Sequence, residues 1–274
     1  MQKPELLAPA GTLQRLKTAV AFGADAVYVG GEAFSMRTAS KNFSADDLKR
    51  ARELTLAKGK KLYIAVNIIP HNQDMALLPA YLEELADLAP DGLIVSDLGV
   101  FTMAQEIAPQ IPLHISTQAN NTNAKTFAAW HKLGATRVVC ARELSFAEIA
   151  EIRAQIPEDL EIEAFVHGAM CISYSGRCLL SSYMTGRDSN RGNCAHPCRW
   201  NYTLMEEQRP GEYYPVYENE RGTFIFNSKD LCMIEYIPEL VASGINSLKL
   251  EGRVKTEYYV ATVVKTYREA IDTY

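Results

Sequence analysis

The fold class can be inferred from residues 61–96, which begin with the sequence KLYIAVN (61–67). It is a short, apolar and partly β-branched run, followed by a helix-like segment at 75–89 and a second apolar run, GLIVS, at 92–96. Parallel strands buried on both faces read as near-continuous apolar runs, and a crossover helix must join them. Residues 61–96 therefore predict one strand–helix–strand unit.

The same unit recurs along the chain. Further strand-like runs lie at 5–11, 26–31, 113–117, 137–141, 161–168 and 247–252. Further helix-like segments lie at 12–22, 45–58, 98–107, 122–134, 145–155 and 256–273. Ser44 and Ser145 fit N-caps of two of these helices. Eight units predict an α/β fold, a (β/α)8 TIM-like barrel. A doubly wound open sheet has the same local pattern, but the unit count and the lack of a GxGxxG turn favour the barrel.

The unit between the seventh and eighth strands is about twice the usual length for such a unit. We predict a single barrel domain over 1–274, with a Cys-rich insert at 169–230 over the C-terminal mouth of the barrel. Residues 199–227 alternate like an antiparallel hairpin with turn signals at Pro-Gly and Arg-Gly. Residues 230–244 are predicted to form one helix that returns to the barrel.

Composition narrows the class of protein. The chain of 274 residues is 47% hydrophobic and 22% charged, with a net charge of −5. It is therefore not a general polyanion binder, and a nucleic-acid contact requires a local patch. The N-terminal residues lack the apolar core of a signal peptide, and no apolar run reaches the ~18–20 residues of a membrane span. We expect a cytoplasmic protein without a membrane partner, in which clustered thiols indicate metal or redox chemistry.

Five of the six cysteines lie in or just after the insert. Six residues lie between Cys171 and Cys178, and fifteen lie between Cys178 and Cys194. Three residues lie between Cys194 and Cys198, and thirty-three lie between Cys198 and Cys232. A zinc knuckle prefers two tight pairs, and only the Cys194–Cys198 pair has that spacing. The irregular spacing favours a cluster held by thiolates from several loops, and four thiolates complete an iron–sulfur site. Cys198 is the uncertain member of the five. Cys140, inside a strand-like run, is expected to be a buried free thiol.

The C-terminal ends of barrel strands line the active site. The candidate catalytic residues there are His167, Glu251 and Arg253, and Asn67 and Gln118 are candidate substrate-binding residues. In the insert, arginines are interleaved with aromatic side chains, as in sites that stack bases and bind phosphates. These residues are Arg177, Arg187, Arg191, Arg199, Tyr174, Tyr183 and Trp200. The alternative is that the arginines balance thiolate charge and the aromatics pack the insert.

Ten positions between Glu163 and Ser181 match the signature E-x-F-x-x-G-[SA]-[LIVM]-C-x4-G-x-C-x-[LIVM]-S. They are Glu163, Phe165, Gly168, Ala169, Met170, Cys171, Gly176, Cys178, Leu180 and Ser181. The chain thus resembles the U-32 peptidase family, also called collagenase-like proteases. PELLAPAG (4–11) and SLKLEGRVK (247–255) also look like this family, so the resemblance covers essentially the whole chain.

The resemblance implies two kinds of activity. Some members are described as collagenases, and others support oxygen-independent hydroxylation and hold a 4Fe–4S cluster. The run GRDSNRGNCAHPCRWNY (186–202) looks most like the branch that hydroxylates the wobble uridine of tRNA with prephenate. That branch implies Cys171, Cys178, Cys194 and Cys232 as metal ligands, with Cys198 as the alternative. It also implies substrate roles for Arg177, Arg187 and Arg199.

The expected partners are therefore tRNA, the small anion prephenate and an unidentified electron donor. Longer members of the branch continue into a C-terminal β-rich domain that this sequence lacks. Two alternatives stay open: a peptidase, and a zinc-stabilised binding module. Aerobic preparations are expected to contain zinc or no metal at the thiols.

Overall fold

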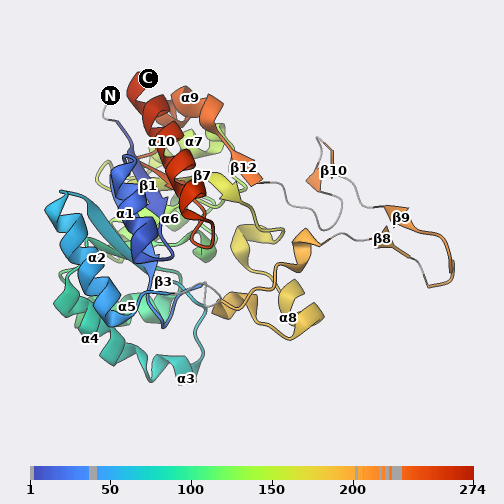
Figure 1. Ribbon diagram of the computed structural model, residues 1–274, viewed down its shortest axis with the longest axis horizontal. Helices are drawn as coiled ribbons and strands as arrows, with labels where there is room; N and C mark the ends of the chain where they lie inside the picture. The colour runs from blue at the N-terminus through green and yellow to red at the C-terminus, as the bar shows by residue number, and fades with distance from the viewer. Residues whose placement is uncertain are drawn as a thin grey trace.

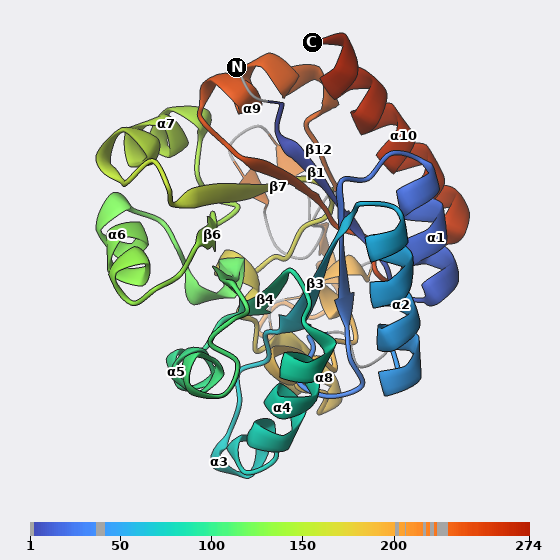
Figure 2. The same ribbon diagram turned by 90° about the vertical axis from the view of Figure 1, so that its left-hand side faces the viewer.

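Eight parallel strands form a closed barrel surrounded by helices (Figures 1 and 2). The computed structural model describes residues 3–36, 42–200, 203–205, 207–215, 218–219, 222–223 and 230–274. The barrel strands are β1 (Glu5–Pro9), β2 (Ala26–Gly30), β3 (Lys61–Val66), β4 (Gly92–Val95), β5 (Leu113–Ile115), β6 (Arg137–Val139), β7 (Glu161–Ala169) and β13 (Ser247–Leu250). Strand β7 pairs with both β6 and β13, and β13 pairs with β1, which closes the ring. The predicted barrel is confirmed, and the open sheet is excluded.

Helices follow the strands in the predicted alternation. They are α1 (Leu13–Ala21), α2 (Ala45–Ala57), α3 (Asn72–Met75), α4 (Leu78–Leu88), α5 (Leu98–Ile107), α6 (Ala124–Lys132), α7 (Phe146–Gln155), α9 (Ile237–Ala242) and α10 (Glu257–Thr273). Ser44 and Ser145 cap α2 and α7 as predicted. The helix predicted over 75–89 is wrong at its start, because the chain begins α4 only at Leu78. Pro79 lacks a backbone N–H and fits only in the first turn of a helix.

The insert leaves the barrel from β7 and returns through β12 (Asp230–Cys232), which pairs antiparallel with the end of β7. It contains α8 (Leu180–Thr185) and two short antiparallel pairs, β8 (Thr203–Leu204) with β9 (Tyr214–Pro215) and β10 (Glu218–Asn219) with β11 (Gly222–Thr223). These pairs agree with the predicted hairpin, of which 201–202, 206, 216–217, 220–221 and 224–227 lie outside the described residues.

The helix predicted over 230–244 is wrong in its first half. Residues Asp230–Cys232 extend the sheet instead, because β7 continues past its parallel neighbours and offers free backbone groups along its edge. Helix α9 starts at Ile237, where Pro238 occupies the first turn.

The inside of the barrel holds a network of buried charges as well as apolar side chains. Arg137 is 2% exposed, and its guanidinium lies 2.7 Å from the Glu5 carboxylate and 3.1 Å from that of Glu163. Glu163, which is fully buried, also pairs with Lys249 at 2.5 Å. Burial acts against the charge of Arg137, but Glu163 and Glu5 hold its pKa above the ordinary value. These pairs close the barrel axis below the mouth.

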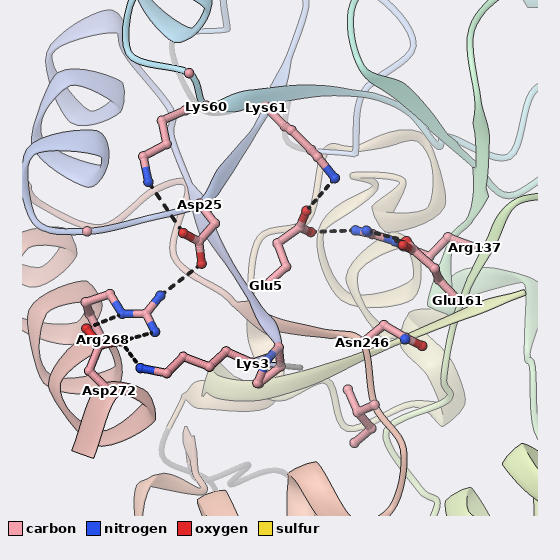
Figure 3. A pocket seen from close by; sticks show the side chains of 14 residues that line it. Lys3, Glu5, Asp25, Lys60, Lys61, Arg137, Glu161, Asn246, Arg268 and Asp272 are labelled. Carbon is pink, nitrogen blue, oxygen red and sulfur yellow. Dashed lines mark hydrogen bonds and ion pairs between the residues drawn. The ribbon is translucent and has the colours of Figure 1, made fainter. Parts of the chain in front are cut away.

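The network reaches a polar hollow of about 650 Å³ at the N-terminal end of the strands (Figure 3). There Asp25 binds Lys60 at 3.4 Å and Arg268 at 2.9 Å, and Lys61 lies 3.5 Å from Glu5. This end of a (β/α)8 barrel usually serves stability, whereas chemistry takes place at the opposite end.

His114 should make the stability of the protein depend on pH. Burial and the charges of Arg137 and Lys249 hold its pKa well below the ordinary value, so the ring stays neutral in the folded state. The unfolded chain takes up a proton below pH ~6.5. We expect the free energy of unfolding to fall by up to about 1.4 kcal/mol per pH unit below that value. Urea titrations between pH 7.5 and 5 measure this slope. His114→Leu should make the free energy of unfolding depend less steeply on pH. An equal slope in the variant would show that His114 does not cause the pH dependence.

Candidate active site

Four thiols line one cavity of about 80 Å³ beside the barrel mouth. Cys171 follows β7, Cys178 precedes α8, and Cys194 and Cys198 lie in the turns after α8. Four separate positions of the insert thus bring their sulfur atoms to one space. The backbone N–H groups of Leu180 and His196 each donate to a cysteine sulfur at 3.3 Å, which fixes Cys178 and Cys194 locally.

Two of the thiols that line this cavity, which we call the thiol cavity, favour the protonated form: Cys171 and Cys198. Burial and the neighbouring thiols raise the pKa of Cys171 and of Cys198, while Arg142 acts in the opposite direction on Cys171 and Arg199 on Cys198. A raised pKa is the reverse of what an activated cysteine nucleophile requires. Binding of a metal cation would overcome this preference for the protonated form, because a bound cation drives thiols to release their protons.

The donor set fits a thiolate-held metal centre. In the part of the chain that the structure describes, no three His, Cys, Asp or Glu side chains converge on a point that would hold a single ion. Four thiols around a cavity suit a cluster of several iron atoms, because a cluster separates its ligands more than one ion does. These four side chains are therefore the donors that a thiolate-bound metal centre would use.

Cys232 does not line the thiol cavity. It is exposed, lies on β12 opposite His167, and interacts with the side chain of Tyr267. The structure thus brings together three of the four predicted ligands with the alternative one, Cys198. Cys140 is 2% exposed inside the barrel wall, and burial raises its pKa to about 12, as expected for an inert thiol.

A second cavity of about 70 Å³, the lumen cavity, lies at the C-terminal ends of the strands. Four of the predicted site residues line it: Asn67, Gln118, Glu251 and Arg253. The Asn67 amide donates to Gln118 Oε1 at 2.9 Å, and Arg253 donates to the Ser35 hydroxyl at 2.7 Å. Gln118 lines the thiol cavity too, so the two cavities share a wall.

His167 lines neither cavity. Its ring lies between Tyr259 and Tyr267, with centroids 6.0 and 5.5 Å away. Burial lowers its pKa, Asp230 raises it, and Lys255 lowers it, with a net decrease. Of the three predicted catalytic residues, Glu251 and Arg253 are thus at the mouth, and His167 is on the outer side of β7.

The insert arginines have distinct placements. Arg177 donates to the Gln118 carbonyl at 2.7 Å, and Arg187 donates to Asn193 at 3.0 Å. Arg199 lines the thiol cavity and pairs with Asp230 at 3.0 Å. Three aromatic side chains of the insert are exposed, Tyr174 by 56%, Tyr183 by 89% and Trp200 by 47%. Tyr183 is thus almost fully exposed to solvent, whereas Tyr174 and Trp200 are about half exposed.

Of two further site residues, Arg142 lies just after a strand-like run, where the sequence predicts that the active site lies, and Lys249 was absent from the sequence-based candidates. Arg142 lines both cavities, and Lys249 forms part of the lumen cavity. A signal for each was present: Arg142 follows the sixth strand directly, and Lys249 interrupts the apolar run SLKL at a position that faces the lumen.

The fold and the site define a (β/α)8-barrel protein with a thiol-rich centre at its mouth. The family model for peptidase family U32 matches residues 11–274, and the chain belongs to this family. The resemblance in the signature around Cys171 is thereby confirmed.

Three curated relatives match nearly the whole chain. It is 42% identical to tRNA hydroxylation protein P of Escherichia coli, over 99% of this chain and 68% of the relative. It is 45% identical to tRNA hydroxylation protein P1 of Bacillus subtilis, over 100% and 64%. It is 35% identical to a collagenase of Porphyromonas gingivalis, over 98% and 66%. The chain thus spans about two thirds of the length of these relatives.

The solved structure of the U32 peptidase Mk0906 has the same fold. The TM-score is 0.57 at 14% identity, over 91% of this chain and 93% of that one. Across the described residues, no helix is long and apolar enough to cross a membrane.

Proposed function

We propose that the chain is the catalytic barrel of an enzyme that hydroxylates the wobble uridine of tRNA to 5-hydroxyuridine without oxygen. One observation carries the proposal: four thiols surround a cavity that shares a wall with a polar pocket at the barrel mouth. The names of the relatives from Escherichia coli and Bacillus subtilis support tRNA as the substrate. Prephenate is the proposed small-molecule co-substrate. Because converting a C–H bond of the base to C–OH removes two electrons, the reaction also requires an electron acceptor, in place of the electron donor expected from the sequence.

Cys171, Cys178, Cys194 and Cys198 would hold a 4Fe–4S cluster. Such a cluster supplies electron transfer or a Lewis-acidic iron, and no side chain provides either. The insert shields the thiols from water, since Cys178 and Cys198 are each 8% exposed. Gln118 is held in place by Asn67 and by its own carbonyl bond with Arg177, so the wall between the cavities is fixed.

The outer face of the insert would bind the RNA. Tyr183 and Arg187 lie at α8 and just after it, so an aromatic ring and a cation occur four residues apart. Exposed aromatic rings stack unpaired bases, and arginines bind phosphates. An anticodon loop offers both groups, whereas the barrel exterior carries the net negative charge of the chain.

Tyr183→Ala is expected to weaken tRNA binding about 5- to 150-fold, the equivalent of one lost base stack of about 1–3 kcal/mol. Filter binding or fluorescence anisotropy with tRNA at fixed salt measures the effect. The matched control is Tyr258→Ala, since Tyr258 is 81% exposed at the start of α10 and does not belong to the insert. Equal tRNA affinities of Tyr183→Ala and Tyr258→Ala would show that the outer face of the insert does not bind the RNA through Tyr183.

Nucleoside analysis of tRNA tests the proposed reaction. A strain that lacks this gene should lose 5-hydroxyuridine, and expression of the full-length protein should restore it. Unchanged tRNA in the deletion strain would refute the proposal.

A peptidase is the second candidate, favoured by the relative named collagenase. Digestion of denatured collagen by the purified protein, lost in Cys171→Ala, would support it. The raised pKa values of Cys171 and Cys198 speak against an activated thiol nucleophile. A zinc-binding module would instead contain stoichiometric zinc under anaerobic conditions.

A further inference from the structure

We propose that Glu143 is a positioning residue for the thiol cavity, because it holds the turn that joins Cys171 to Cys178. This turn is the short 3-10 helix η2 (Tyr174–Gly176), which lies between the two cysteines in the insert. Glu143 belongs to the barrel, in the loop between β6 and α7. The inference rests on the proposed function in so far as the four thiols are taken as metal ligands. A side chain of the barrel would thus set where two of these thiols lie.

The carboxylate of Glu143 contacts one residue of the turn twice. Ser175 donates its backbone N–H to Glu143 Oε1 at 2.6 Å and its hydroxyl to Oε2 at 3.1 Å. Hydrogen bonds to a carboxylate are stronger than those between neutral groups. Ser175 is only 1% exposed, so loss of the carboxylate would remove the acceptor of a buried N–H and of a buried hydroxyl.

The turn depends on this contact because Ser175 has a backbone conformation that serine rarely adopts. Its φ is +44° and its ψ is +28°, which lies in the left-handed region. A residue with a Cβ atom is less stable there, and it keeps such a conformation only where the surrounding structure holds it. Gly176 follows with a φ of +80°. The path from Cys171 to Cys178 therefore passes through two consecutive left-handed residues, of which Glu143 holds the first.

The residues after the turn are also held on the barrel. Arg177 donates from Nε to the Gln118 carbonyl at 2.7 Å, and Gln118 lines the thiol cavity. Cys178 follows directly, and its backbone N–H donates to the side chain of Asn190 in the insert at 3.2 Å. Cys178 is thus fixed from two sides, by the insert and by the barrel. On the barrel side, the contact of Glu143 acts directly on the left-handed residue.

Labelling of individual cysteines in the full-length protein, prepared without metal, tests this role. Iodoacetamide modifies each thiol at a rate that mass spectrometry of the peptides measures. In Glu143→Ala, Cys178 should react about 10- to 100-fold faster than in the parent protein, because the lost hydrogen bonds allow the turn to open. Cys178 is 8% exposed and Cys140, in the barrel wall, is 2% exposed. The rate at Cys140 should stay unchanged, which shows that the barrel remains folded.

Two further variants separate positioning from a general loss of stability. Glu143→Gln keeps one acceptor oxygen for the Ser175 N–H, so its rate at Cys178 should lie between those of the parent and Glu143→Ala. Ser175→Gly, added to Glu143→Ala, should slow this labelling again. Glycine adopts the left-handed conformation without steric cost, and it removes the hydroxyl that has lost its acceptor. The control is Glu106→Ala, which removes an exposed glutamate on α5 and should change no rate.

Three results would each overturn the inference. They are equal rates at Cys178 in the parent and Glu143→Ala, faster labelling of Cys140 together with Cys178, and no slowing by Ser175→Gly. Iron analysis of the parent after anaerobic purification tests the proposed function separately. A parent protein without iron would refute the cluster, while faster labelling of Cys178 in Glu143→Ala would still assign the turn to Glu143. Iron in the parent with unchanged labelling would keep the cluster and reject the role of Glu143.

Discussion

Replacing Cys178 by alanine is expected to remove the iron–sulfur chromophore and abolish 5-hydroxyuridine formation. Cys178 is 8% exposed and lines the thiol cavity with three other cysteines, and three thiolates cannot complete a four-cysteine cluster site. Iron, sulfide and visible absorption are measured after anaerobic purification of the full-length protein, and tRNA nucleosides are measured in a complemented strain. A parent protein without iron under these conditions would contradict the cluster itself.

The fourth ligand is decided by a pair of matched variants. Cys198 lines the cavity, so Cys198→Ala should lose iron as Cys178→Ala does. Cys232 lies on β12 beside Tyr267, so Cys232→Ala should keep its cluster. The opposite result would favour the ligand set implied by family resemblance and would require β12 to move toward the insert.

Arg137→Met is expected to lower the free energy of unfolding by about 3–5 kcal/mol. The substitution keeps most of the side-chain volume but leaves the buried carboxylates of Glu5 and Glu163 without their shared cation. Burial by itself would raise the pKa of Glu5, and the charge of Arg137 is the main effect that lowers it. Equilibrium urea denaturation at pH 7 measures the loss.

The matched control is Lys265→Met on α10. Lys265 pairs with Glu269 at 3.7 Å, but both side chains are more than half exposed, so the loss should stay below about 1 kcal/mol. If Arg137→Met were no more destabilising than Lys265→Met, the buried network would not be what stabilises the barrel axis. Part of the Glu5 carboxylate's contribution should also disappear as the pH falls through its lowered pKa.

The repeating units could be predicted from the sequence because each strand and helix is encoded locally. Seven of the eight barrel strands lie within the predicted runs, and β7 passes its run by one residue. The caps at Ser44 and Ser145 come from side chains three residues from their partners. The errors occur where local patterns compete with tertiary pairing. Residues 230–232 could be read as helical, but the exposed edge of β7 takes them as a strand.

The position of the site at the barrel mouth could be predicted from the sequence, but the set of cysteines that line the thiol cavity could not. Asn67, Gln118, Glu251 and Arg253 line one cavity because the barrel places the strand ends together, and their catalytic and binding roles stay predictions. The order of the cysteines along the chain could not show whether Cys198 or Cys232 lines the thiol cavity with the other three, because the paths of the loops determine which side chains lie together. Orientation could not be predicted either: His167 is at a strand end, yet it faces Tyr259 and Tyr267 outside the barrel.

The pairing of β7 with β12 gives the insert a stem. Ala169 is the register partner of Asp230, so sixty intervening residues begin and end at two neighbouring backbone positions. Neighbouring antiparallel residues lie only about 5 Å apart, and the entropic cost of closing the loop between them grows only slowly with its length, by about 0.6 kcal/mol for each doubling. The ends of the segment are therefore fixed at the barrel whatever lies between them, and contacts such as that of Arg177 with the Gln118 carbonyl join its interior to the mouth.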